Sequence, residues 1–227
     1  VWTHWALLSI ALGVAGCAKD SNRSGTVPVT APVDGGTETS SIIVHNGRQY
    51  AAGSRRSDPD DLEGIPFAEV PAASGGASEA ASLREFMPPV GDQGEIQGSC
   101  VAWAAAYAVK SYHEHIQRRT SYTQETLFSP ADLYNRLEPF TCDAPIFITD
   151  GLTVLSNRGV LPLSDSPYNP NECRDYRNDL DNKAREGRIR RYRQINIRDA
   201  SEIKSFIRAG MPVITNIEIH HEFLDLL

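Results

Sequence analysis

The segment DQGEIQGSCVAWA, Asp92 to Ala104, sets a lone cysteine between a glycine-rich turn and an alanine-rich apolar run. Apolar residues recur near helical spacing from Cys100 to Gln117, so the pattern predicts a long helix that begins at the cysteine. A helix N-terminus carries partial positive charge and unpaired backbone N–H groups, which lower the pKa of a thiol. Cys100 is therefore a candidate nucleophile, and the alternative is a small buried residue that begins a helix.

The residues before the cysteine suit the same chemistry. Gly98 and Ser99 allow the backbone to turn tightly and to approach a substrate. Acyl transfer also needs hydrogen-bond donors aimed at the developing oxyanion. The backbone N–H of Cys100 and the side-chain amide of Gln93 are the candidate donors.

The whole chain sets broad bounds on function. Its 227 residues are enough for one or two domains with a buried core, and its formal net charge of −7 argues against a nucleic-acid partner. The basic run from Lys183 to Arg193 is a local exception, which we interpret as a solvated loop leading into a strand.

The N-terminal segment WALLSIALGVAGC, Trp5 to Cys17, has the length of a signal peptide and is short for a bilayer span. Its end, Val-Ala-Gly-Cys, resembles a bacterial lipobox. Residues 1–17 are expected to be a signal peptide with Cys17 lipidated after cleavage, although VWTHW lacks the usual Lys or Arg. The protein is then exported and membrane-anchored, or secreted if Cys17 is a chance cysteine, and disulfides persist there.

Composition divides the remainder in two. Residues 18–82 are rich in Ser, Gly, Thr, Pro, Asp and Ala and are predicted to be a linker, interrupted by one hairpin at Ile42 to Gly53 around Asn46-Gly47. A compact domain is predicted over residues 83–227. Its pattern of helices first and strands later favours an α+β fold. Helices are predicted at 100–117, at 130–137 with Ser129 as its cap, at 149–158 with Gly159 ending it, and at 200–210. Strands are predicted at 191–199 and 211–219.

The string PVGDQGEIQGSCVAWA, Pro89 to Ala104, resembles the active-site segment of papain-like cysteine peptidases, particularly bacterial members. The resemblance implies that Cys100 is the nucleophile and Gln93 the oxyanion-hole side chain. It also implies a helical left half that carries the nucleophile helix, followed by the start of a β-barrel right half. Two residues depart from the common pattern: Gln97 stands where a disulfide cysteine is usual, and Val101 stands where Trp is common.

Three later segments match the same family in the right order, so the match spans residues 83–227. They are FSPADLYN at 128–135, DGLTVLSNRGVLPLSDSPYN at 150–169 and AGMPVITNIEIHHEF at 209–223. Cys142 and Cys173 bracket a segment that a disulfide closes in such enzymes, so the resemblance implies a Cys142–Cys173 bridge, with two free thiols as the alternative. No metal site is expected, because there is no CxxC pair and no cysteine has a closely spaced histidine.

A cysteine peptidase also needs an imidazole base. His113 and His115 lie along the nucleophile helix, with Cys100 to His113 spanning about 20 Å at 1.5 Å per residue, which is too far. Both are predicted to be exposed. His220 and His221 follow a strand, but the family base lies about 130 to 150 residues past the cysteine. That position falls beyond residue 227, so the domain is expected to be incomplete at its C-terminus.

The sequence thus predicts a monomeric cysteine-type peptidase that hydrolyses peptide bonds through a Cys100 acyl-enzyme and needs no cofactor. Its partners are a protein or peptide substrate and, through the N-terminal lipid, the membrane. Two alternatives remain: a catalytically inactive papain-fold binding module, and a related Cys-dependent acyltransferase or amidase. The linker is interpreted as a tether, Asn216 falls on a strand expected to line a specificity pocket, and substrate preference is not readable.

Overall fold

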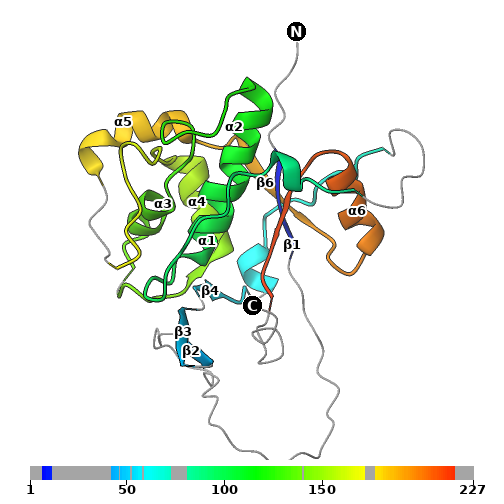
Figure 1. The fold of residues 1–227 in the computed structure, drawn as a ribbon. Helices are drawn as coiled ribbons and strands as arrows, with labels where there is room; N and C mark the ends of the chain where they lie inside the picture. Colours follow the sequence, from blue (N-terminus) through cyan, green and yellow to red (C-terminus); the bar gives the residue numbers. More distant parts are fainter. Residues whose placement is uncertain are drawn as a thin grey trace, which may run out of the picture.

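The structure is a computed structural model that describes residues 7–11, 42–45, 47–51, 53–57, 59–72, 81–139, 141–171 and 177–217. Figure 1 shows a helical half, in green and yellow, beside a smaller part that holds a sheet and the orange helix. This mixed architecture confirms the predicted α+β class. The helical run that begins at Cys100 lies between the two parts.

The central helical run begins at Cys100 and ends at Arg118, as predicted. It consists of α1 (Cys100–Ala102), the π-helical stretch η3 (Trp103–Lys110) and α2 (Ser111–Arg118). The middle stretch has the wider i→i+5 turn, which is rare and occurs often at functional sites. Two of its alanines, Ala105 and Ala106, are fully buried, so neighbouring elements pack directly against this side of the helix.

Shorter helices pack around this run. Ser129 caps α3 (Pro130–Arg136), because its hydroxyl accepts a hydrogen bond from the Asp132 N–H at 3.1 Å, and Gly159, with φ of 79°, follows α4 (Ile148–Asn157). Both boundaries agree with the sequence prediction. The shared core is built from apolar residues of the central run and of these two helices: Val101, Ala102, Ala105, Val109, Leu133, Tyr134, Leu152 and Leu155.

The basic run at 183–193 is not a plain loop. It overlaps α5 (Asp181–Ala184), the 3-10 turn η5 (Arg185–Gly187) and strand β6 (Arg191–Ile195), while η4 (Asn178–Leu180) precedes it. The prediction of a solvated loop was therefore wrong for its first part. Ala184 is fully buried, which explains why this stretch is helical and packed rather than extended.

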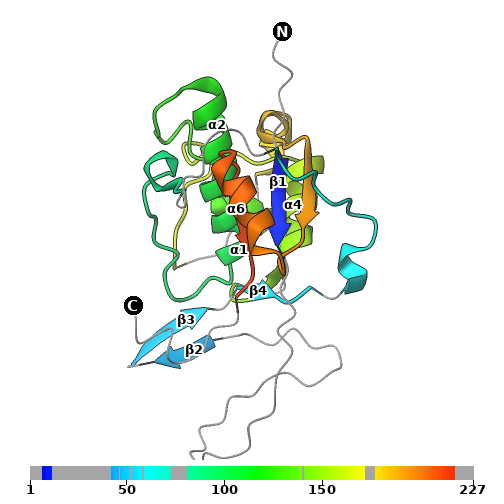
Figure 2. The same ribbon diagram turned by 90° about the vertical axis from the view of Figure 1, so that its right-hand side faces the viewer.

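The three-stranded sheet has the order β6-β1-β7, with both neighbours parallel to β1. The bounds are Leu7–Ala11 for β1 and Val213–Thr215 for β7. The amphipathic helix α6 (Ala200–Arg208) lies against this sheet, with Phe206 fully buried next to Ile195 (Figure 2). Strand β1 comes from the segment predicted to be a signal peptide, so a chain that keeps these residues uses them in the sheet.

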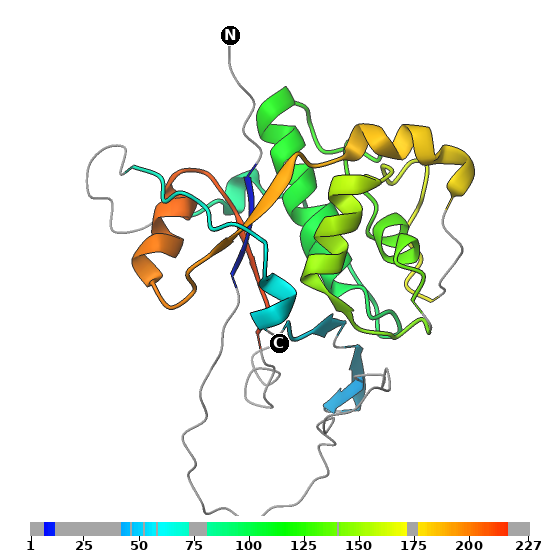
Figure 3. The same cartoon turned by 180° about the vertical axis from the view of Figure 1, so that it is seen from behind.

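Part of the predicted linker also belongs to the folded unit. A hairpin forms as predicted from β2 (Ile42–His45) and β3 (Arg48–Ala51), with Gly47 in its turn at φ of 77°. Strand β4 (Ser54–Arg55) then pairs in parallel with β5 (Ile146–Phe147) at the lower side of the helical half (Figure 3).

Residues 59–72, which follow β4, contact the sheet. They include the turn η1 (Pro59–Leu62), and the Ala68 N–H donates to the Gln194 carbonyl at 2.8 Å. The turn η2 (Arg84–Phe86) comes later in the chain, before the helical half. Backbone hydrogen bonds hold these residues in place. Such bonds need no apolar side chains, so a sequence pattern based on apolar residues does not reveal them. Residues 53–72 therefore differ from the linker that composition predicts.

Candidate active site

Cys100 is the first residue of α1. The Trp103 N–H donates to the Ser99 carbonyl at 3.0 Å, which begins helical bonding at this position. Val101 and Ala102 are buried in the core, so the first turn is firmly placed and the Cys100 side chain is half-buried at the helix end. The prediction that a helix begins at Cys100 is confirmed.

The turn that leads to Cys100 requires a glycine. The Gly98 N–H donates to the Cys142 carbonyl at 3.0 Å. A Cβ atom on Gly98 would lie 2.5 Å from the Ala144 carbonyl oxygen, far inside van der Waals contact. The close approach fixes this turn against the loop that leads into β5.

Gln93 belongs to the same turn. Its Nε2 donates to the Gln97 carbonyl at 2.7 Å, and its own carbonyl accepts a hydrogen bond from the Tyr168 hydroxyl at 2.8 Å. The Tyr168 hydroxyl also lies 2.9 Å from the Ser99 hydroxyl. Tyr168 therefore links the candidate oxyanion donor to the residue before the nucleophile. Sequence reasoning noted the Pro-Tyr turn here but gave Tyr168 no role.

Gln97 is nearly fully buried, with 2% of its surface exposed. Its Nε2 donates to the Asn169 carbonyl at 2.7 Å, so a polar contact holds the turn to the 160s loop. Gln97 is the residue that stands where the family named in the sequence analysis commonly carries a disulfide cysteine. The amide thus connects the nucleophile turn to a second loop without a covalent bond.

A strand from the predicted linker passes directly beside the thiol. The backbone amide of Gly53 lies close enough to the Cys100 thiol to lower its pKa, and the Gly53 carbonyl accepts a hydrogen bond from the Ile146 N–H at 3.1 Å. A Cβ atom on Gly53 would lie 2.2 Å from the carbonyl carbon of Gly98. Residues 53–55 therefore form an extended segment, which we call the covering strand, pressed between the nucleophile turn and β5.

Asn216 holds the other side of the covering strand. Its Oδ1 accepts a hydrogen bond from the Ser54 hydroxyl at 2.5 Å, and its Nδ2 donates to the Arg55 carbonyl at 2.9 Å. Asn216 directly follows β7 instead of lying on the strand, and the expectation that it lines a specificity pocket stays a prediction. The sequence did not predict the covering strand, because three residues of backbone pairing leave no periodic pattern.

Burial beneath this strand governs the chemistry of the thiol. Burial raises the pKa of Cys100 to about 11, and the backbone amides of Gly53, Val101 and Cys100 lower it by a smaller amount. The sequence-based expectation of a lowered pKa is therefore wrong for this state. The helix N-terminus does act in the expected direction, but loss of water around the thiol outweighs it.

Of the described histidines, His45 ends β2, and His113 and His115 lie on α2, far along the helical run from Cys100. His113 is not exposed as predicted: burial lowers its pKa to about 4, and its Nε2 has no hydrogen-bond partner among the described residues. His115 is half-buried, with Nδ1 2.5 Å from the Thr120 carbonyl and its ring stacked on Tyr122. His220 and His221 lie outside the described residues.

The remaining site predictions are tested only in part. Cys142 is disulfide-bonded, but Cys173 lies outside the described residues, so their pairing stays a prediction. Cys17 and its lipid also lie outside them. Within the described ranges, no helix is long and apolar enough to cross a membrane, and no group of three His, Cys, Asp or Glu could hold a metal ion.

Comparison with known proteins identifies the fold. No family model and no curated protein sequence matches this chain. Among solved structures, xylellain, a cysteine protease from Xylella fastidiosa, matches with a TM-score of 0.55 and 21% identity over 74% of this chain and 66% of that chain. The fold is thus that of papain-like cysteine proteases, and this chain spans just under two thirds of xylellain.

A second similar structure comes from a study of the mite allergens Blo t 1 and Der p 1. It matches with a TM-score of 0.47 and 18% identity, over 70% of this chain and 52% of that chain.

Proposed function

We propose that the protein is a cysteine-type peptidase in which Cys100 is the nucleophile and Gln93 an oxyanion donor. One observation carries the proposal: an extended segment of polypeptide already lies next to the Cys100 thiol, with the Gly53 amide close to Cys100 and the Gly53 carbonyl hydrogen-bonded to Ile146 of β5. A site that holds an extended backbone beside a thiol at a helix N-terminus is suited to bind a peptide and to present its carbonyl carbon to that thiol.

The reaction follows from these groups. The Cys100 thiolate attacks the carbonyl carbon of a bound peptide, and the oxyanion accepts hydrogen bonds from the Cys100 N–H and from Gln93. The amide of Gln93 has two N–H groups, so its bond to Gln97 leaves a second for the oxyanion. The C–N bond breaks, the amine leaves with a proton from a general acid, and water hydrolyses the thioester.

Two changes precede that reaction. The covering strand leaves the cleft, because substrate occupies the same space and because the thiol pKa stays near 11 while the strand is in place. An imidazole approaches Cys100 to take its proton and later to protonate the amine. We place this imidazole in a part of the protein outside the described residues.

The protein expressed from its full reading frame, assayed on fluorogenic peptides and on casein, tests the proposal. Hydrolysis that disappears in Cys100→Ala and falls about 10²- to 10³-fold in Gln93→Ala is expected. Equal activity of Cys100→Ala and the unaltered protein would overturn it.

Two other results point to the alternatives. Peptide binding without any turnover favours an inactive binding module. Product that carries an added amine acceptor in place of water favours an acyltransferase with the same nucleophile.

A further inference from the structure

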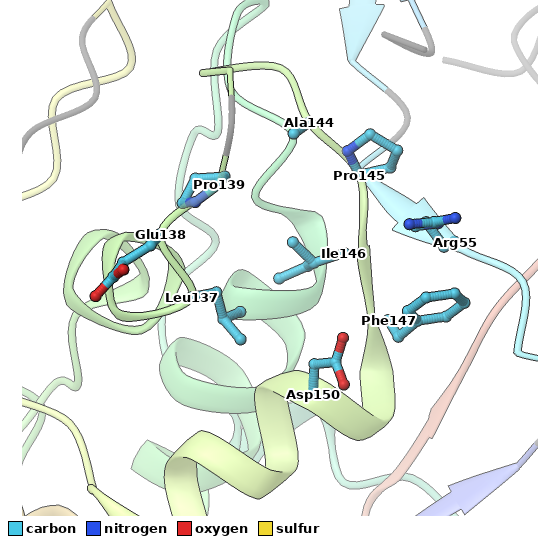
Figure 4. Close-up of a pocket in the computed structure, with 9 residues that line it drawn as sticks. All are labelled: Arg55, Leu137, Glu138, Pro139, Ala144, Pro145, Ile146, Phe147 and Asp150. Carbon is cyan, nitrogen blue, oxygen red and sulfur yellow. The ribbon is translucent and has the colours of Figure 1, made fainter. Parts of the chain in front are cut away.

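A hollow of ≈ 290 Å³ lies beside β5, at the end of the covering strand (Figure 4). The side chains of Leu137, Pro139, Pro145 and Ile146 form an apolar part of its wall, and polar atoms form the rest. Apolar walls of this kind contact the methylene groups of a long side chain well.

The hollow has a fixed position relative to the nucleophile. Gly53 lies at the Cys100 thiol, and Arg55, two residues further on, pairs in register with Phe147. Two residues of extended chain span about 7 Å. A peptide bound in the cleft therefore directs a side chain into this hollow when that side chain is two residues from the one at the thiol.

The covering strand already presents a cation there. The Arg55 guanidinium carbon lies 4.4 Å from the centre of the Phe147 ring, within the range of a cation–π contact. Arg55 lines the hollow, and Figure 4 shows it above the Phe147 ring at the edge of the cavity.

Asp150 supplies negative charge from the opposite side. Figure 4 shows its carboxylate directed toward Ile146 and Phe147, whereas the Glu138 side chain points away from the centre. Partial burial, together with the nearby Asp61 carboxylate, raises the pKa of Asp150, and Arg55 counteracts that rise. The negative charge of the ionised Asp150 carboxylate is thus only partly balanced by nearby positive charge. A further cation in the hollow would stabilise this ionised form.

We propose that this hollow binds a basic side chain, arginine or lysine, of the peptide held next to Cys100, with Phe147 contacting the cation and Asp150 supplying the opposite charge. The proposal rests on the proposed function, because it assigns a substrate preference to the same cleft. Arg55 occupies this place in the present structure. A peptide with a basic residue two positions from the thiol takes over the contacts of Arg55 when the covering strand leaves.

Labelling of Cys100 tests this pocket without requiring turnover. Three N-chloroacetyl dipeptide amides are compared, chloroacetyl-Ala-X-amide with Arg, citrulline or norleucine as X. The chloroacetyl group takes the place of Gly53, and X lies two residues further toward the C-terminus, as Arg55 does in the covering strand. The thiol sulfur bonds to the methylene carbon, chloride leaves and the thiol proton goes to solvent. Citrulline matches arginine in shape but lacks its charge. The protein is the full chain carrying Arg55→Ala, which vacates the hollow, and intact mass with peptide mapping gives the rate at Cys100.

The arginine probe is expected to label about fivefold faster than the citrulline probe, the scale of a partly exposed cation contact. The ratio is expected to fall below about twofold when Asp150→Asn is added, and to persist with Glu138→Gln, the matched control at the same hollow. Equal rates for arginine and citrulline, or a preference that survives Asp150→Asn, would overturn the pocket assignment.

Failure of the pocket and failure of the proposed function give different results. If the peptide probes label Cys100 faster than chloroacetamide does but show no charge preference, only the assignment of the basic pocket is overturned. If no peptide probe labels Cys100 faster than chloroacetamide, the cleft binds no peptide, and both proposals fall together.

Discussion

The Nδ2 atom of Asn216 donates a hydrogen bond to the Arg55 carbonyl at 2.9 Å and so joins the covering strand to the segment that follows β7. The same side chain accepts a hydrogen bond from the Ser54 hydroxyl. One residue thus bonds to two of the three residues that lie over the nucleophile.

Asn216→Ala removes both of these bonds. Each contributes about 0.5–1.5 kcal/mol net, so the covering strand should open more often and the Cys100 alkylation rate should rise about 5- to 150-fold. Iodoacetamide labelling followed by peptide mapping measures this rate. Ile217→Thr, a change at the exposed neighbouring residue, is the control. A rate for Asn216→Ala equal to that of the control would show that Asn216 does not hold the strand.

Gly53→Ala should displace the covering strand by steric conflict. The added Cβ would lie 2.2 Å from the Gly98 carbonyl, which is backbone and has little room to move. We expect faster Cys100 alkylation and a thiol pKa that moves down toward its ordinary value, because water returns to the sulfur. Arg56→Ala, at an exposed position of the same segment, should leave both quantities unchanged. An unchanged pKa in Gly53→Ala would contradict the role given to burial.

The raised thiol pKa also predicts a pH dependence of stability. The folded state keeps the Cys100 proton up to about pH 11, whereas the unfolded chain releases it at the ordinary, lower pKa. Unfolding therefore becomes easier as pH rises between those two values, and the stability that the neutral thiol contributes at lower pH is lost. Urea denaturation from pH 8 to pH 11 measures this loss. Cys100→Ser should show a shallower decline, and identical declines would argue against a buried, neutral thiol.

The buried ion pair of α3 should be important for folding. Arg136 Nε donates to Asp132 Oδ2 at 2.7 Å, both side chains are fully buried, and the same oxygen accepts the Leu161 N–H at 2.9 Å. Asp132→Asn leaves the arginine charge without this carboxylate, at an expected cost of about 3–5 kcal/mol of unfolding free energy.

Urea denaturation measures the effect, with Asp179→Asn as the matched control. Asp179 pairs with Arg177 at the surface, where such a pair contributes about 0–1 kcal/mol. Comparable losses in the two variants would show that the buried pair is not a special source of stability.

The features of the fold that depend on residues close together in the sequence could be predicted from the sequence. The helical run from Cys100, the Ser129 cap and the glycine after α4 all follow from spacing and capping residues, and the structure confirms them. The turn that holds Gln93 was found from a motif. These features need only residues close together along the chain.

The contacts that decide the state of the nucleophile are not local. Gly53 and Cys100 are distant in sequence, and the strand that joins them bonds through its backbone, which carries no side-chain signature. The pKa of the thiol follows from that burial, so it could not be predicted from the helix N-terminus alone. The only signal in the sequence was a glycine without an evident turn, at Gly53.

The strand order β6-β1-β7 sets the order in which parts of this fold can form. In a chain that keeps Leu7–Ala11, this strand lies between Arg191–Ile195 and Val213–Thr215, which follow it only after the whole helical half. The strand stays without these two partners until the helical half has been made, and closing so large a loop slows folding. The helical half, whose contacts are more local, can form first and present the nucleophile turn before the sheet exists.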